Sequence, residues 1–153
     1  MRNGPLPDGK LTRLPTGDLA EVAEALRAAG LPAEDLDGSR MTFFRLADDQ
    51  GALGWAAVER HGPDALLRSV LTVTDRRSSG IGSNLVRRVS ALAADGGVER
   101  LWLLTETAAP FFAKLGFIET ERASAPAGMQ DTTEFRSVCP ASGTCMTLKL
   151  VRP

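Results

Sequence analysis

The 153-residue chain has no tyrosine, only one histidine and only two cysteines. Without tyrosine, no phenolic hydroxyl can donate a proton in whatever chemistry the chain performs. One histidine and two cysteines are too few ligands for a structural zinc site, so we expect no metal. Two cysteines also build no disulfide framework, which agrees with a reducing compartment. The single His61 stands in a Glu-Arg-His-Gly-Pro turn and is expected to be exposed.

Charge of one sign and long apolar runs are missing as well. The 18 basic and 19 acidic residues give a net charge of -1, which argues against a nucleic-acid or membrane-surface binder held by bulk charge. No apolar run approaches the roughly 20 residues of a transmembrane helix, and the N-terminus lacks a signal-peptide core. With 43% hydrophobic residues, the sequence predicts one cytoplasmic domain that covers residues 1–153.

Hydrophobic periodicity predicts both strands and helices. Strands are expected at 41–47, 53–60, 65–73, 101–104, 117–121 and 145–151, with helices at 18–30, 81–96, 107–116 and 126–135 and a leading strand or arm within 1–15. Asp18 and Glu21 have capping-box spacing at the start of the first helix. In the second helix, Leu92 is predicted to share one apolar face with Ile81, Leu85 and Val89. Strands grouped early and then alternating with helices predict a mixed α/β sheet.

The stretch from Val70 to Val86 is the most informative part of the sequence. Its first residues read as a strand, which runs into Arg77-Ser78-Ser79-Gly80-Ile81-Gly82 and then into a helix. Glycine permits a tight turn, the first N–H groups of a helix form an anion site, and Arg77 adds positive charge. A plain strand-to-helix turn is the alternative. Phosphate-binding motifs of the P-loop and dinucleotide type fit worse, because the loop ends Gly82-Ser83-Asn84 and no third glycine follows.

Two segments resemble the GNAT family of N-acetyltransferases. The glycine loop matches that family's Arg/Gln-x-x-Gly-x-Gly loop, and the residues from Phe111 to Phe117, Phe-Phe-Ala-Lys-Leu-Gly-Phe, resemble its Phe-Tyr-x-Lys-Leu-Gly-Phe segment. A helix and a strand lie between them in the order that the family requires. The resemblance implies a mixed α+β acyltransferase fold with a central, mostly antiparallel twisted sheet, helices on both faces, and acetyl-CoA as co-substrate.

The resemblance also implies which residues hold acetyl-CoA. The pantetheine arm would lie along the strand at Leu71, Thr72 and Val73. Its pyrophosphate would bind the backbone amides of Arg77, Ser78, Ser79, Gly80, Ile81, Gly82 and Ser83, and its thiol end would lie beside Phe111 and Phe112. Phe112 stands where the family has a tyrosine that protonates the leaving thiolate. That role is therefore vacant or taken by water or another side chain, and Phe112 is interpreted mainly as core packing.

Glu59 and Arg68 are the candidates for acceptor chemistry. If the turn at 62–63 joins two antiparallel strands symmetrically, both side chains point to one sheet face and lie diagonally adjacent. Arg68 stands in an apolar run that should be buried, and buried arginine is unusual unless it is paired. The two residues form either a structural ion pair or a site in which Arg68 receives a substrate carboxylate and Glu59 directs a water that deprotonates an amine. Ser69 and Thr72 would supply hydrogen bonds nearby.

Three further segments resemble a narrower branch, the N-acetyltransferases associated with bacterial arsenic-resistance operons. They are Leu67-Arg68-Ser69, the run 103–107, and the residues from Glu134 to Ser142, Glu-Phe-Arg-Ser-Val-Cys-Pro-Ala-Ser. This resemblance implies acetylation of a small amine, such as an amino-acid analogue with an arsenic- or phosphorus-bearing group. Cys139 either binds trivalent arsenic or is a small buried residue before a proline, and Cys145 is interpreted as structural.

These observations predict an enzyme that transfers acetyl from acetyl-CoA directly to the primary amine of a small molecule, without a covalent enzyme intermediate. A non-catalytic acyl-CoA-binding sensor or regulatory module is the alternative, and the missing tyrosine supports it. The helix at 18–30, a short helical turn predicted at 32–36 and the helix at 126–135 would wall the acceptor pocket. Members of the family often form dimers, so a homodimer remains open.

Overall fold

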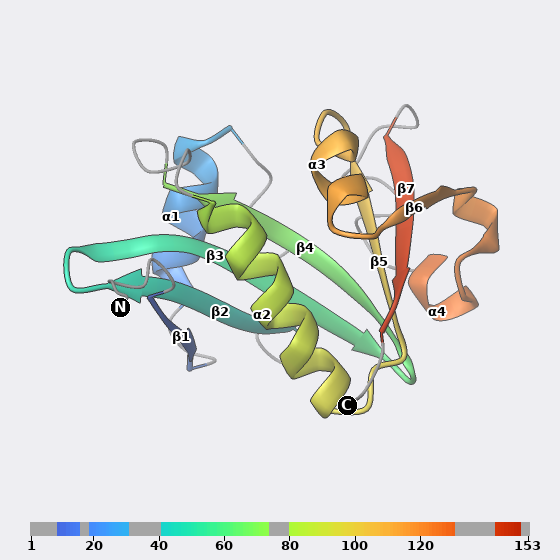
Figure 1. Ribbon diagram of the computed structural model, residues 1–153, viewed down its shortest axis with the longest axis horizontal. Coiled ribbons are helices and arrows are strands. Elements are labelled where there is room, and N and C mark those ends of the chain that lie inside the picture. Colours follow the sequence, from blue (N-terminus) through green and yellow to red (C-terminus); the bar gives the residue numbers. More distant parts are fainter. Residues whose placement is uncertain (1–8, 16–18, 31–40, 74–79, 131–142, 151–153) are drawn as a thin grey trace. The chain divides into compact units, whose positions relative to one another are not determined.

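The computed structural model describes residues 9–15, 19–30, 41–73, 80–130 and 143–150. Within these ranges, seven strands form one sheet in the order β1-β2-β3-β4-β5-β7-β6 (Figure 1). The strands are β1 (Lys10–Arg13), β2 (Met41–Asp48), β3 (Gly51–His61), β4 (Asp64–Thr72), β5 (Arg100–Thr105), β6 (Ile118–Thr120) and β7 (Thr144–Lys149). The helices are α1 (Ala20–Ala28), α2 (Ile81–Asp95), α3 (Ala109–Lys114), the short 3-10 helix η2 (Arg122–Ser124) and α4 (Ala127–Gln130).

Most of the sheet is antiparallel. β2 pairs with β1, β7 with β5, and β7 with β6 in antiparallel register, whereas β4 and β5 run parallel. The predicted mixed fold with a mostly antiparallel sheet is therefore confirmed. None of the described helices is long and apolar enough to cross a membrane.

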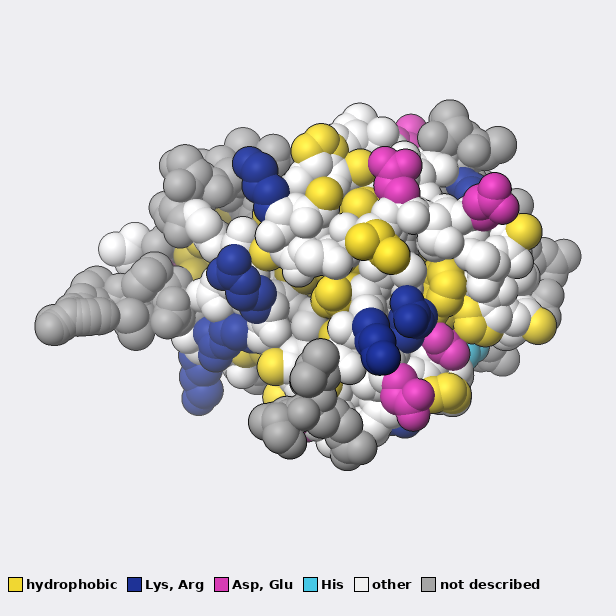
Figure 2. Space-filling model, turned by 45° about the vertical axis from the view of Figure 1, so that its right-hand side comes forward, with side chains coloured by type: hydrophobic (Ala, Val, Ile, Leu, Met, Phe, Trp, Pro, Cys, Tyr) yellow, Lys and Arg dark blue, Asp and Glu magenta, His cyan; other side chains and the backbone are white. Residues whose placement is uncertain are grey.

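The chain folds into two compact units. The first unit comprises Met1–Ala57 and Ser69–Val89, and the second comprises Val58–Arg68 and Ser90–Pro153. On the face drawn in Figure 2, basic and acidic side chains both lie among apolar ones, in keeping with the near-zero net charge.

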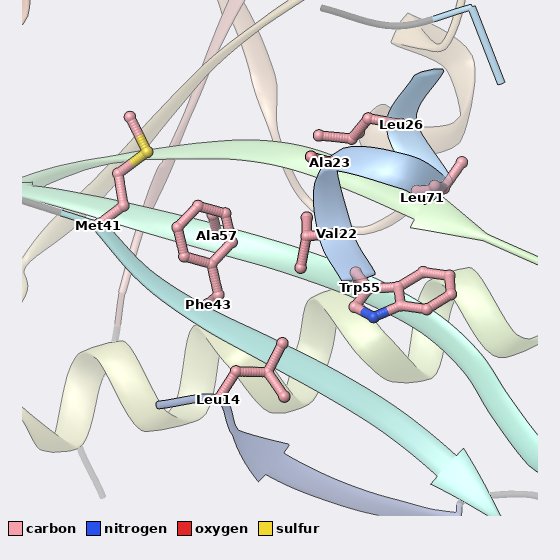
Figure 3. Close-up of a cluster of buried hydrophobic side chains, with 9 residues drawn as sticks. All are labelled: Leu14, Val22, Ala23, Leu26, Met41, Phe43, Trp55, Ala57 and Leu71. Atoms are coloured by element: carbon pink, nitrogen blue, oxygen red, sulfur yellow. The ribbon is translucent and has the colours of Figure 1, made fainter. Parts of the chain in front are cut away.

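The core of the first unit lies under α1 (Figure 3). Val22, Ala23 and Leu26 recur at helical spacing, so they share one face of α1, and each is buried. They pack in one apolar cluster with Leu14, Met41, Phe43, Trp55, Ala57 and Leu71. Helix α2 covers the other face, because its Leu85 approaches Gly54 and neighbouring strand residues point to opposite faces.

The start of α1 differs from the prediction. The helix begins at Ala20, and its N-cap residue Leu19 makes no side-chain cap hydrogen bond. Asp18 lies outside the described residues. The carboxylate of Glu21 accepts hydrogen bonds from Arg45 and from the Trp55 indole. Glu21 therefore ties α1 to β2 and β3, a contact between distant segments that local spacing could not predict.

Helix α2 follows the predicted face except at its end. Ile81, Leu85 and Val89 are at most 3% exposed, whereas Leu92 is 46% exposed. The prediction for Leu92 was wrong because helical periodicity fixes the angular face of a residue but not what covers the last turn. Ala94 and Val98 supply the buried apolar surface there.

The second unit has its own core around β5. Residues 101–104 are all buried, as predicted for a strand that is apolar on both faces. Both edges of β5 are paired as well, one with β4 and the other with β7. One cluster joins Leu66, Trp102, Leu104, Ala125, Met129 and Cys145, so α4 and the residue that follows η2 pack against this part of the sheet. Helix α3 is shorter than predicted and begins at Ala109. The amide of the preceding residue, Ala108, donates a hydrogen bond to the Thr105 hydroxyl.

Candidate active site

The turn between β3 and β4 brings two opposite charges together inside the second unit. Glu59 and Arg68 are each 4% exposed, and Arg68 Nη1 lies 3.4 Å from Glu59 Oε1. The expected pairing across the hairpin is confirmed. Placing two charges in an apolar interior is unfavourable unless each has partners, and here each charge is a partner of the other.

Sequence reasoning missed a third member of this cluster, His61. Its Nε2 atom lies 2.9 Å from Glu59 Oε2, and its side chain is only 17% exposed. The prediction that His61 would be exposed was wrong, because residues two apart on a strand point to the same face. The spacing of two residues between Glu59 and His61 was therefore enough to predict that their side chains share a face of the sheet. Each carboxylate oxygen of Glu59 thus has one partner, Arg68 on Oε1 and His61 on Oε2.

Strand β4 carries one extra residue just beyond Arg68. At the turn between β3 and β4, two residues separate the strands, so His61 lies opposite Asp64. At the far end of the same two strands, the Val73 amide donates to the Leu53 carbonyl. The second pairing is offset from the first by one residue. Ser69 has φ of 56°, and among the described residues it alone adopts a positive φ without being glycine. A β-bulge at Ser69 accounts for both observations and redirects the side chains that follow. The structure gives Ser69 this backbone role and leaves its predicted hydrogen bonding a prediction.

The parallel ladder between β4 and β5 is short. Its described pairs are Asp64 with Arg100, Ala65 with Leu101 and Leu66 with Trp102. Strand β4 nevertheless continues to Thr72, and the described ladder with β5 ends at Leu66. Within the described part of the chain, the β5-facing edge of β4 therefore loses its ladder partner after Leu66. Backbone groups on such an edge can pair with an amide-bearing ligand.

The residues predicted to hold pantetheine lie at the end of β4 in the first unit. Leu71 is 8% exposed within the apolar cluster, and Thr72 and Val73 are half-buried. Gly54 of β3 lies directly behind them, since a Cβ there would be 2.7 Å from the Leu71 carbonyl oxygen. The close approach of β3 thus fixes the backbone of β4 at this point.

The described half of the glycine loop opens α2. Gly80 has φ of 73°, which favours glycine, and its carbonyl accepts the helical bond from the Asn84 amide. The amides of Ile81, Gly82 and Ser83 precede that bond and so have no partner within the helix. The first turn of α2 carries no acidic residue. These donors fit a phosphate group, whereas the predicted ligands Arg77, Ser78 and Ser79 lie outside the described residues.

Phe111 and Phe112 belong to α3 in the second unit. Phe112 is 6% exposed and makes edge-to-face contacts with Phe111, at a centroid distance of 5.0 Å, and with Phe117, at 5.5 Å. The ring therefore packs in the core. Its predicted contact with the thiol end of acetyl-CoA stays a prediction.

Cys145 is a buried, free thiol on β7, with 3% of its surface exposed. Burial raises the pKa of this thiol, and the nearby Arg122 guanidinium opposes that rise in pKa. The neutral thiol packs in the apolar cluster of the second unit, as expected of a structural cysteine. Cys139 lies outside the described residues.

Residues 39–119, more than half of the chain, match the family model described as acetyltransferase (GNAT) domain. The fold and the family model together define an acyltransferase, the class expected from the sequence. The chain belongs to the GNAT acetyltransferase family. A comparison with curated protein sequences finds no match.

Solved structures share the fold at low sequence identity. N-acetylglutamate synthase from Neisseria gonorrhoeae, complexed with coenzyme A and N-acetyl-glutamate, is 18% identical with a TM-score of 0.77, over 94% of this chain and 35% of that one. Rv2747 from Mycobacterium tuberculosis, in complex with CoA and NLQ, is 20% identical with a TM-score of 0.76, over 93% of this chain and 99% of that one. The ribosomal-protein-S18-alanine N-acetyltransferase from Escherichia coli is 20% identical with a TM-score of 0.65, over 94% and 95%.

The chain spans about a third of the length of the N-acetylglutamate synthase. At these identities, the neighbours establish the fold. The first two of these neighbours were solved in complex with coenzyme A.

Proposed function

We propose that residues 1–153 form one acetyl-CoA-dependent N-acetyltransferase domain that transfers acetyl directly to the primary amine of a small molecule bearing a carboxylate. The observation that carries the proposal is the buried Glu59–Arg68 pair in a chain of the GNAT family. A buried ion pair is often no more stabilising than apolar residues of the same volume. Its presence in the core of an acetyltransferase domain therefore supports a role in substrate recognition.

Arg68 and Glu59 would divide the acceptor chemistry. Arg68 offers a rigid fork of N–H donors that matches a carboxylate, and Glu59 can direct a water that takes a proton from the bound ammonium group. The neutral nitrogen then forms a C–N bond with the thioester carbonyl carbon. The C–S bond breaks, the second amine proton leaves with water, and the coenzyme A sulfur ends as a thiol. No covalent bond to the enzyme is required.

The start of α2 and the end of β4 would hold acetyl-CoA. The free amides of Ile81, Gly82 and Ser83 suit its pyrophosphate, because amide donors and the positive end of the helix dipole both favour phosphate. Backbone groups from Leu71 to Val73 suit its pantetheine amides. Acetyl-CoA supplies an acetyl group activated as a thioester.

Two observations bear on the acceptor. N-acetyl-glutamate in the synthase neighbour is an acetylated amino acid, the kind of product that a carboxylate-binding Arg68 would accommodate. The resemblance to the arsenic-resistance branch extends the proposal to amino-acid-like arsenicals and phosphinic analogues. Much of that resemblance rests on residues 134–142, which lie outside the described residues.

A second candidate function follows from Phe112, which is buried where the family has its tyrosine acid. Without that acid, the chain would be an acyl-CoA-binding sensor or regulatory module. In the enzyme that we propose, water protonates the thiolate instead, so the loss of tyrosine lowers the rate without abolishing it.

Acetyl-CoA turnover with mass detection of the product tests the proposal. The acceptor panel comprises amino acids, amino-acid-like arsenicals, phosphinic analogues and polyamines. Acetylated product from carboxylate-bearing amines is the expected result. Measurable acetyl-CoA binding without product from any acceptor would overturn the enzyme in favour of the sensor.

A further inference from the structure

The two tryptophans of the chain each donate a hydrogen bond from the indole to a carboxylate, and the proposed chemistry uses neither. In the first unit, Trp55 Nε1 donates to Glu21 Oε2 at 2.9 Å. In the second unit, Trp102 Nε1 donates to Asp64 Oδ1 at the same distance of 2.9 Å. Both tryptophans are at most 9% exposed, and a buried indole N–H usually finds an acceptor. The two bonds are alike in chemistry and length, so any difference in role comes from what lies beside each ring.

Trp55 lies beside the end of β4 that is proposed to bind pantetheine. The Val73 amide donates to the Leu53 carbonyl, and two residues from that bond along each strand, toward the turn, Trp55 lies opposite Leu71. Both side chains belong to the apolar cluster under α1 (Figure 3). The indole therefore packs on the side of β4 where the Leu71 backbone would meet the pantetheine amides.

Strand β4 is held from one edge at this point, among the ladders that the structure describes. Its ladder with β5 ends at Leu66, whereas its pairing with β3 reaches Val73. The backbone at Leu71 is thus held by β3 and by the packing of the Leu71 side chain in the apolar cluster. A change in that packing shifts the backbone more readily here than where both edges of a strand are paired.

The orientation of the Trp55 ring is fixed by a charged clamp. Arg45 Nη1 donates to both carboxylate oxygens of Glu21, at 2.9 and 3.0 Å, and the Trp55 indole donates to one of them. These three residues come from α1, β2 and β3, so one carboxylate joins three elements. Because the carboxylate has two donors of its own, it is a fixed acceptor that holds the indole against the apolar cluster.

We propose that Trp55, held by Glu21, is a positioning residue for acetyl-CoA. The bond between them sets the place of the β4 backbone at Leu71, which in turn pairs with the pantetheine arm. The inference rests on the proposed acetyl-CoA site, and Trp55 acts through Leu71 without touching the cofactor. When the bond is lost, the ring can turn, the Leu71 backbone shifts, and hydrogen bonds to the pantetheine amides weaken.

Trp55→Phe tests this role, and Trp102→Phe is its matched control. Each variant removes one indole and one hydrogen bond to a carboxylate, so both should lower the free energy of unfolding. The Kd for acetyl-CoA, measured by calorimetry, should distinguish them. In Trp55→Phe it should rise about tenfold, the equivalent of about one hydrogen bond, and in Trp102→Phe it should stay at the wild-type value. In turnover, the KM of Trp55→Phe for acetyl-CoA should rise more than its KM for the acceptor.

Changes at Glu21 test the same bond from its acceptor. Glu21→Leu removes the acceptor and should raise the Kd for acetyl-CoA as much as Trp55→Phe does. Glu21→Gln keeps a side-chain oxygen for the indole and should recover most of that loss. Combining Glu21→Leu with Trp55→Phe should add little to either single change, because both break one interaction.

A wild-type Kd for acetyl-CoA in Trp55→Phe overturns the proposal. An equal rise of this Kd in Trp55→Phe and Trp102→Phe also overturns it, because that is the result of general loosening. If wild-type protein binds no acetyl-CoA, the proposed cofactor site and this inference both fail. Failure of acetyl transfer alone is distinct, since no acceptor would then be acetylated while the Kd values remain measurable.

Discussion

The molecule contains two arginine–glutamate pairs of the same chemistry in opposite surroundings. In the first unit, Arg45 and Glu21 lie 2.9 Å apart with side chains 36% and 35% exposed. In the second unit, Arg68 and Glu59 lie 3.4 Å apart with side chains 2% and 6% exposed. The exposed pair has the shorter contact, and the buried pair bears the larger loss of hydration. A buried pair with a long contact is weak evidence for stability, and this contrast is the basis on which we propose a role for it in acceptor binding.

The third partner of each carboxylate extends the comparison. Glu21 accepts a hydrogen bond from the Trp55 indole, at 2.9 Å, and Glu59 is bound by the imidazole of His61 at the same distance. The indole nitrogen can only donate, whereas an imidazole nitrogen donates or accepts according to its tautomer. The first cluster is a fixed clamp between α1 and the sheet. The second cluster joins two residues of β3 to one residue of β4.

Breaking the buried pair should have the largest effect. Arg68→Ala leaves the Glu59 charge buried with fewer partners, so we expect the free energy of unfolding to fall by about 3–5 kcal/mol in denaturant titrations. In the fraction that folds, KM for the acceptor should rise far more than KM for acetyl-CoA.

The double variant Glu59→Leu with Arg68→Met is the matched control for that loss. It removes both charges and keeps the volume, so it should recover most of the stability without recovering acetyl transfer. Recovery of both would show that the pair is purely structural.

A substitution in the first unit that alters no charged residue should have an intermediate effect on stability. Gly54→Ala places a Cβ 2.7 Å from the Leu71 carbonyl oxygen, which belongs to backbone and must shift. We expect a loss of about 1–3 kcal/mol, as for other overpacked sites, together with weaker acetyl-CoA binding measured by calorimetry. Gly51→Ala, at the exposed start of β3 where an added Cβ meets nothing within 4 Å, tests backbone strain without this clash. An unchanged acetyl-CoA affinity in Gly54→Ala would show that the backbone of β4 at Leu71 does not contribute to acetyl-CoA binding.

Disrupting the exposed pair should have the smallest effect. A double-mutant cycle with Glu21→Ala and Arg45→Ala should give a coupling energy of about 0.2–1 kcal/mol, lower still at high salt. The same cycle across Glu59 and Arg68 should give a larger value that responds less to salt. Equal coupling energies for the two pairs would remove the contrast between them.

Sequence patterns predicted the elements and the buried pair, but not the tertiary contacts of Glu21 and His61. Alternation along the strands and the two-residue turn were enough to place Glu59 beside Arg68. Glu21 has capping-box spacing in the sequence, yet its carboxylate binds residues 24 and 34 positions away. The bulge at Ser69 left no local signal either, because an extra residue in a strand shows only when the partner strand is known.

Acetyl transfer to an amino acid and to its matched carboxamide, in wild-type protein and in Arg68→Ala, tests the central claim most directly. The two acceptors share the amine and differ only in the carboxylate. The account predicts a higher kcat/KM for the acid in wild type and no preference in the variant. Equal rates for both acceptors in wild type, or a preference that survives in Arg68→Ala, would contradict it.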